Sequence, residues 1–313
     1  MIVSIIHSQA QMTQYLQSEQ PVETKLAYAM AVFTVAVWGL TFINTKLLMQ
    51  MGLTAADIVF YRTAIAWIGL FCSCPRPLLA RGTDELRLAI LGVFGGSAYF
   101  LLENTALETS QAGNVSFLVS SSPIFAVLLG MIFYRDIKAS WRFWIGSWIA
   151  LAGIVCLLYN GVLELNLWPW GDILGLAAGL SWAVYSLLLR PLFGRYSVDF
   201  ITRKVMFWTL VSLTPVFAFE PLTTDWELLT RWEVLPQLLF LGLIAQTLCF
   251  TLWNDVTRSI GAAKTSNFLY LCPVVTVVAG VWLLDEKWTP VMLIGCALVL
   301  VGVWLCHGGI KRK

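Results

Sequence analysis

The chain contains ten apolar segments of about twenty residues, joined by short polar connections. An α-helix of about 20 apolar residues spans the hydrocarbon core of a bilayer, so each segment predicts one transmembrane helix. Only 12% of the residues are charged and 58% are hydrophobic, whereas soluble domains are about 25% charged. We therefore expect an all-α integral membrane protein with ten transmembrane helices, near residues 27–50, 57–74, 87–107, 112–134, 141–160, 171–190, 202–219, 234–254, 262–284 and 289–308.

Basic residues are concentrated on one side of the predicted membrane. Sixteen of the 20 Lys and Arg residues lie in the terminal regions or at connections that follow even-numbered segments. The opposite side holds only Lys46, Arg62, Arg231 and Lys287. The positive-inside rule therefore predicts that both termini are cytoplasmic. Residues 1–25 form a polar tail without the pattern of a cleaved signal peptide.

The two halves of the chain are similar to each other at an offset of 150 residues. The pairs include Asn104 with Asn254, Phe100 with Phe250, Pro123 with Pro273 and Gly130 with Gly280. The halves cover about residues 26–160 and 171–308, and each holds five predicted spans. Because five is odd, the second half enters the membrane from the opposite side. Such inverted repeats are typical of secondary transporters.

Several segments resemble EamA-type members of the drug/metabolite transporter superfamily over about residues 26–308. They are AVWGLTFINTK at Ala36–Lys46, Arg62, the run Glu103–Gly130 and its second copy Ser259–Gly280. The resemblance implies an inner-membrane carrier, frequently an exporter of amino acids or other small metabolites, with a central cavity lined by spans 1, 3, 4, 6, 8 and 9. Small multidrug carriers of this superfamily use a carboxylate in the first span for proton exchange, and residues 27–49 here contain none.

Other functional classes lack support in the sequence. A net charge of +2 offers no large field to nucleic acid. The two histidines, His7 and His307, lie at opposite ends of the chain, and the seven cysteines form no CxxC pair. We find no GxSG, GxGD or P-loop pattern. We therefore expect no enzyme, no metal site and no cofactor.

Charged residues within spans require an explanation, because burying a charge at the bilayer centre costs at least about 2.5–3.5 kcal/mol. Glu103 lies 16 residues after Arg87, about 24 Å along a helix, and so toward the outer face. It either gates or binds a cation there, or reaches the headgroups or pairs with Arg62 or Lys46. For Arg62 we favour a structural or gating role. Lys46 and Lys264 lie near span ends and are expected to extend to water.

The deeper candidates are neutral and aromatic, which suits an uncharged or zwitterionic organic solute. Trp38 and Trp182 occupy equivalent positions in the two halves, either lining a cavity or packing helices. Asn104 and Asn254 are also equivalent in the two halves, and they either contact the substrate or cap helices and form hydrogen bonds between them. Together with Glu103, the candidate substrate-binding residues are Trp38, Asn44, Tyr99, Asn104, Ser120, Trp182, Tyr185, Gln246, Asn254, Asn267 and Tyr270.

Pro123 and Pro273 interrupt equivalent spans. A proline leaves the carbonyl four residues earlier without its helical donor. The two positions are therefore either hinges or static kinks.

The sequence predicts a secondary carrier that exports small organic metabolites, such as amino acids, by alternating access. Alternatives are uptake or exchange of a nucleoside, sugar or vitamin-like solute, and a membrane-embedded ligand sensor. Its partners are then the solute, the lipid bilayer and a proton or counter-solute, with a monomer as a plausible state. Asp57, Glu103 and Asp255 are the carboxylates available for proton coupling.

Overall fold

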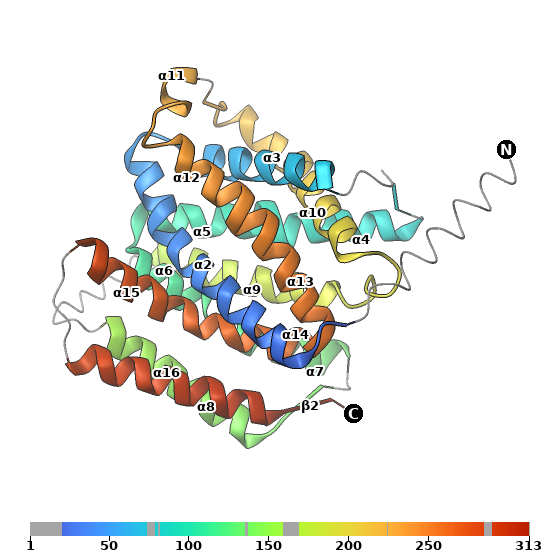
Figure 1. The fold of residues 1–313 in the computed structure, drawn as a ribbon, viewed down its shortest axis with the longest axis vertical. Coiled ribbons are helices and arrows are strands. Elements are labelled where there is room, and N and C mark those ends of the chain that lie inside the picture. The colour runs from blue at the N-terminus through green and yellow to red at the C-terminus, as the bar shows by residue number, and fades with distance from the viewer. Residues whose placement is uncertain are drawn as a thin grey trace, which may run out of the picture.

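The computed structural model describes residues 21–73, 79–80, 82–134, 137–158, 169–223, 225–284 and 290–312. Long helices make up nearly all of this part of the chain and pack side by side as a bundle (Figure 1). Most of the expected tail, the centre of the connection between the halves and Lys287 lie outside the described residues.

The first half contains five helical segments. They are α2 (Thr24–Gln50), α3 (Ala55–Ser73), a third segment of α4 (Thr83–Gly92), η1 (Val93–Ser97) and α5 (Ala98–Thr109), a fourth of α6 (Ala112–Val119) and α7 (Ser122–Phe133), and α8 (Trp141–Leu158). The short strand β1 (Ile137–Ala139) precedes α8.

The second half follows the same order. It begins with α9 (Pro169–Leu188), then α10 (Val198–Leu213) with η2 (Thr214–Ala218), and the short α11 (Trp226–Leu229). The next long segment consists of α12 (Leu235–Leu239), η3 (Phe240–Leu248) and α13 (Cys249–Ile260), and the one after it of α14 (Ala262–Ser266), η4 (Asn267–Leu271) and α15 (Cys272–Leu284). The last is α16 (Pro290–Gly309), followed by strand β2 (Ile310–Arg312).

The helical segments coincide with the predicted spans. Eight segments in the described part are long and apolar enough to cross a membrane, and a shorter apolar helix covers Trp141–Leu157. The remaining predicted span, residues 202–219, corresponds to α10 and η2. Helix α10 is only 16 residues long and carries Asp199, Arg203 and Lys204 in its first two turns, which explains its lower apolar character.

Irregular helical turns occur at positions related by the 150-residue offset. The π-helical turns η1 and η3 interrupt the third and the eighth segment. A break at Ser120–Ser121 divides the fourth segment, and the 3₁₀ turn η4 divides the ninth. Such turns release backbone carbonyls from the α-helical pattern and are frequent at functional sites.

Side chains from the first helix of the opposite half satisfy carbonyls in both π-helical turns. The Trp38 Nε1–H on α2 donates to the Ala245 carbonyl in η3 at 2.9 Å. The Ser181 hydroxyl on α9 donates to the Phe94 carbonyl in η1 at 2.7 Å. The irregular turns thus connect the two halves through hydrogen bonds.

Helices α8 and α16 lie side by side along one edge of the bundle (Figure 1). Glycines allow their backbones to touch: a Cβ atom on Gly302 would lie 2.5 Å from the Ala150 nitrogen, and one on Gly153 would lie 2.7 Å from the Val299 nitrogen. These contacts are typical of small residues at membrane helix interfaces.

Two short strands are the one departure from the all-α expectation in the described part of the chain. Strand β1 pairs antiparallel with β2, with Ile137 opposite Arg312 and Ala139 opposite Ile310. The Ser140 amide also donates to the Gly309 carbonyl at 2.8 Å. The pairing satisfies backbone groups where the two chain segments leave the bundle, and it joins the C-terminal residues to the α7–α8 connection.

The α8–α16 contact predicts that two Gly→Ala substitutions on α16 differ in their effect on stability. Gly302→Ala should lower the free energy of unfolding by about 1–3 kcal/mol, because the added methyl forces the two backbones apart. Gly308→Ala is the matched control, since a Cβ atom there has nothing within 4 Å. Thermal unfolding of both purified variants in detergent measures the difference. Equal melting temperatures would show that this close approach is not required.

Candidate functional site

A small cavity lies within the bundle, between segments of both halves. Its volume is about 30 Å³, which accommodates one or two water molecules. An organic solute would therefore require the cavity to widen. The lining comes from seven segments and comprises Trp38, Thr41, Phe42, Arg62, Tyr99, Phe100, Glu103, Ser116, Val119, Ser120, Trp182, Phe250, Leu269 and Cys272.

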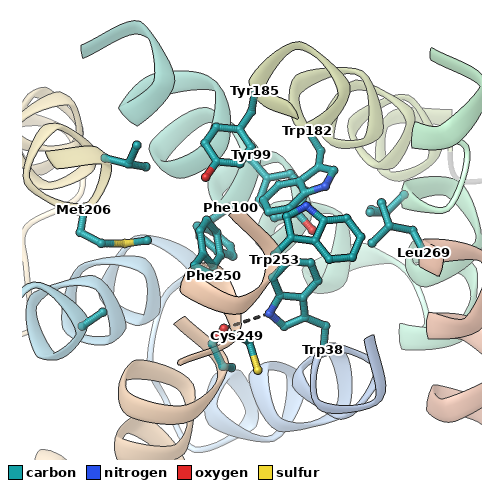
Figure 2. Close-up of a cluster of buried hydrophobic side chains, with 14 of the residues drawn as sticks. Trp38, Tyr99, Phe100, Trp182, Tyr185, Met206, Cys249, Phe250, Trp253 and Leu269 are labelled. Carbon is teal, nitrogen blue, oxygen red and sulfur yellow. Dashed lines mark hydrogen bonds between the residues drawn. The ribbon is translucent and has the colours of Figure 1, made fainter. Parts of the chain in front are cut away.

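Aromatic rings form much of the wall (Figure 2). The predicted pair Trp38 and Trp182 are in contact, edge to face, with ring centroids 5.1 Å apart. Tyr99 lies 4.9 Å from Trp182, and Phe250 lies 5.6 Å from Trp38. We call the connected rings the aromatic cluster: Trp38, Tyr99, Phe100, Trp182, Tyr185, Phe250 and Trp253.

Hydrogen bonds hold one side of the aromatic cluster. The Tyr185 hydroxyl donates to Asn254 Oδ1 at 2.9 Å, and Asn254 Nδ2 donates to the Thr202 hydroxyl at 3.0 Å. By contrast, the indole N–H groups of Trp182 and Trp253 are buried without a partner among the described residues. Of these two residues, Trp182 lines the cavity.

Arg62 on α3 is 1% exposed and has a defined set of neighbours. Its Nε donates to Gln246 Oε1 at 2.8 Å, and its guanidinium carbon lies 4.1 Å from the Phe100 ring centroid. Gln246 Nε2 in turn donates to the Thr63 hydroxyl at 2.9 Å. One guanidinium nitrogen, Nη1, is buried without a hydrogen-bond partner in the described structure. This donor belongs to a side chain that lines the cavity.

Glu103 on α5 also lines the cavity and is 3% exposed. Tyr99, one helical turn earlier on the same helix, lines the cavity beside it. Across the described residues we find no direct ion pair between Glu103 and Arg62. Pairing with Lys46 does not occur either, since Lys46 Nζ donates to the Ser110 carbonyl at 2.7 Å. Arg62 and Glu103 therefore line the same cavity without a direct salt bridge between them.

The remaining candidate carboxylates serve local structure. Asp57 accepts hydrogen bonds from the Thr54 amide at 3.1 Å and from the Thr223 amide at 2.9 Å. Asp255 forms an ion pair with Arg258 at 2.9 Å. Of the three carboxylates considered for proton coupling, only Glu103 lines the cavity.

Both prolines follow the breaks in their segments. Pro123 is the second residue of α7, and Pro273 is the second residue of α15. Pro273 cannot donate to the Leu269 carbonyl, which instead accepts from the Cys272 amide and from the Ser120 hydroxyl, the latter at 3.1 Å. Ser120 therefore connects the break of one half to that of the other.

The structure separates the predicted site residues into those that line the cavity, those that contact the lining from behind and those that lie elsewhere. Six line the cavity: Trp38, Arg62, Tyr99, Glu103, Ser120 and Trp182. Tyr185, Gln246 and Asn254 support them from behind. Asn104 donates to the Ala55 carbonyl at 3.3 Å, and Asn44, Asn267 and Tyr270 do not line the cavity either.

Several lining residues were missed by sequence reasoning. Phe100 and Phe250 occupy equivalent positions in the repeat and both belong to the aromatic cluster, so the offset could have identified them. Thr41, Phe42, Ser116, Val119, Leu269 and Cys272 also line the cavity. Their composition resembles that of any buried helix face, so no sequence signal distinguishes them.

The Arg62–Gln246 contact predicts a measurable coupling. Gln246→Ala should reduce the free energy of unfolding by about 1.5–3 kcal/mol, because the buried guanidinium loses an acceptor. Combining Arg62→Met with Gln246→Ala should cost less than the sum of the two single changes. Thermal unfolding measures each corner of the cycle. Gln237→Ala, on the neighbouring helix α12, is the control. Additive effects would mean that the pair contributes no specific stabilisation.

Comparison with known proteins places the chain in a family. Residues 25–159 and 169–307 each match the EamA-like transporter family. A crystal structure superposes on 93% of this chain and all of its own with a TM-score of 0.71, at 18% sequence identity.

Similar proteins include an uncharacterized transporter of Archaeoglobus fulgidus, 24% identical, with 89% of this chain and 96% of the relative covered. A probable terminal-alkyne amino-acid exporter of Streptantibioticus cattleyicolor is 28% identical, with 88% and 91% covered. A probable amino-acid metabolite efflux pump of Escherichia coli is 22% identical, with 91% and 95% covered. The chain is a multi-pass membrane protein and belongs to the EamA-like transporter family.

Proposed function

We propose that this chain is a secondary carrier that exports small zwitterionic metabolites, such as amino acids, by alternating access. The observation that carries the proposal is that Arg62 and Glu103, which form no direct salt bridge, both lie buried on the wall of one cavity. In this proposal both termini lie in the cytoplasm, the two halves are inverted repeats and a monomer suffices.

The chemistry of the wall matches an amino acid at three points. A substrate carboxylate can accept a hydrogen bond from Arg62 Nη1, which has no partner among the described residues. A substrate ammonium group can approach Glu103 and the faces of the neighbouring rings. The aromatic cluster then offers an apolar surface to a side chain. Two relatives named as exporters of amino-acid compounds support the same class.

The small size of the cavity favours a closed state within a transport cycle. A volume of about 30 Å³ is far below the roughly 300 Å³ of an ordinary ligand pocket. Binding therefore requires the rings from α2 and α9 to separate. The irregular turns in equivalent segments lie where such a movement can bend the helices.

The first prediction concerns the charges of the ligand. Phenylalanine should raise the melting temperature of the purified protein, whereas phenylalaninamide and 3-phenylpropionate, which each lack one charge, should not. Glu103→Gln should weaken phenylalanine binding about tenfold or more, the value of a lost charge-assisted hydrogen bond.

Glu108→Gln serves as the control, because Glu108 lies on the same helix but is exposed. Other amino acids, nucleosides and sugars complete the panel, and liposome flux with and without a pH gradient then tests direction and coupling. A panel in which no amino acid binds would contradict the zwitterion proposal, and binding without flux would favour a sensor.

The second prediction concerns the breaks. Replacing both Pro123 and Pro273 by Ala restores two backbone donors and should straighten the segments, so transport should slow while ligand binding persists. Pro290→Ala, at the start of α16, is the control. Wild-type flux in liposomes containing the double variant would reduce both prolines to packing elements.

A further inference from the structure

A second and larger cavity opens at the end of the bundle where α2 begins and α16 ends. Its volume is about 530 Å³, within the roughly 300–1,000 Å³ range of small-molecule sites. The wall combines residues from both halves, including Tyr28, Tyr134, Arg190, Thr257 and Lys264. We call it the terminal cavity.

The terminal cavity is lined by cations. Arg190, Arg258 and Lys264 contribute to its wall, and the described lining contains no Asp or Glu. Arg258 is paired with Asp255 at 2.9 Å, and the Arg190 guanidinium carbon lies 4.5 Å from the Tyr134 ring centroid. The side chain of Lys264 makes no hydrogen bond or ion pair with any described residue. Its ammonium group is the donor that a ligand can engage without breaking an existing contact.

A buried hydroxyl adds a second, independent feature. Thr257 lines the cavity, is only 3% exposed, and its Oγ1 has no hydrogen-bond partner in the described structure. Buried hydroxyl groups are normally hydrogen-bonded. This group lies on the same wall as Arg258 and one short turn before the segment that carries Lys264.

The terminal cavity is separate from the central one. On α9, Ser186 and Leu187 line the terminal cavity, whereas Trp182, one turn earlier, lines the central one. On α2, the corresponding residues Tyr28 and Trp38 are ten positions apart, about 15 Å along the helix. The two cavities have no lining residue in common.

We infer that the terminal cavity binds organic anions through a carboxylate or phosphate group. The cations supply charge-assisted hydrogen bonds to such a group, and apolar residues such as Leu187 and Ile260 cover its organic part. The Thr257 hydroxyl, which has no partner in the described structure, belongs to a residue of the same wall. The same chemistry is available from a soluble metabolite or from the headgroup of an anionic lipid. This binding does not depend on the proposed transport function.

The test compares Lys264→Gln with Lys25→Gln in the full chain. Lys25 is exposed near the same end of the molecule and does not line the cavity, so both variants lose one charge but only one loses a cavity donor. Citrate and pyrophosphate are the soluble probes, titrated against protein in nanodiscs of phosphatidylcholine. Native mass spectrometry of protein from vesicles with one-fifth phosphatidylglycerol reports retained anionic lipid.

We expect Lys264→Gln to weaken binding of at least one probe, or to reduce lipid retention, about tenfold, while Lys25→Gln behaves as wild type. If Lys264→Gln weakens the binding of a soluble probe, the cavity is a metabolite site. If this variant reduces only the retention of anionic lipid, the cavity is a headgroup site. If neither probe nor lipid binds, or if both variants lose binding equally, the inference is overturned. Because the readout is binding at this end and not flux, its failure is distinguishable from failure of the central site.

Discussion

Every backbone N–H and C=O group inside an apolar bundle must find its partner within the protein. Regular helices meet this requirement internally, so the breaks reveal where the two halves depend on each other. The Ala245 carbonyl accepts from Trp38, the Phe94 carbonyl from Ser181 and the Leu269 carbonyl from Ser120. Each of these bonds joins residues of different halves. The irregular turns therefore hold the interface together at the same depth as the aromatic cluster.

This arrangement links the polar contacts to the candidate site. Trp38 both donates to a carbonyl of an irregular turn in the other half and lines the central cavity, as does Ser120. A movement that widens the cavity must lengthen or exchange these bonds. The cost of such an exchange is modest when a new partner replaces the old one, because a net hydrogen bond contributes only about 0.5–1.5 kcal/mol. The same bonds can hold a closed state and still permit its opening.

The sequence predicted the helical segments well, because the length of an apolar run is a direct physical constraint. Of the residues proposed because polar and aromatic groups stand out in such runs, Trp38, Tyr99, Glu103, Ser120 and Trp182 line the central cavity. The sequence did not reveal which way each helix faces. Asn267 and Tyr270 were chosen for the same reason and lie outside the cavity lining. The terminal cavity was also missed, because Arg190 and Lys264 come from separate segments and were interpreted as charges near span ends.

The pairing of β1 with β2 has a practical consequence for anyone handling this protein. Ile310, the first residue of β2, lines the terminal cavity. A peptide fused directly after β2 therefore starts at the rim of that cavity and is held there by the strand pairing. A histidine tag at this position would place imidazoles and linker atoms beside the cavity cations, so binding measurements should use protein cleaved back to its own last residues.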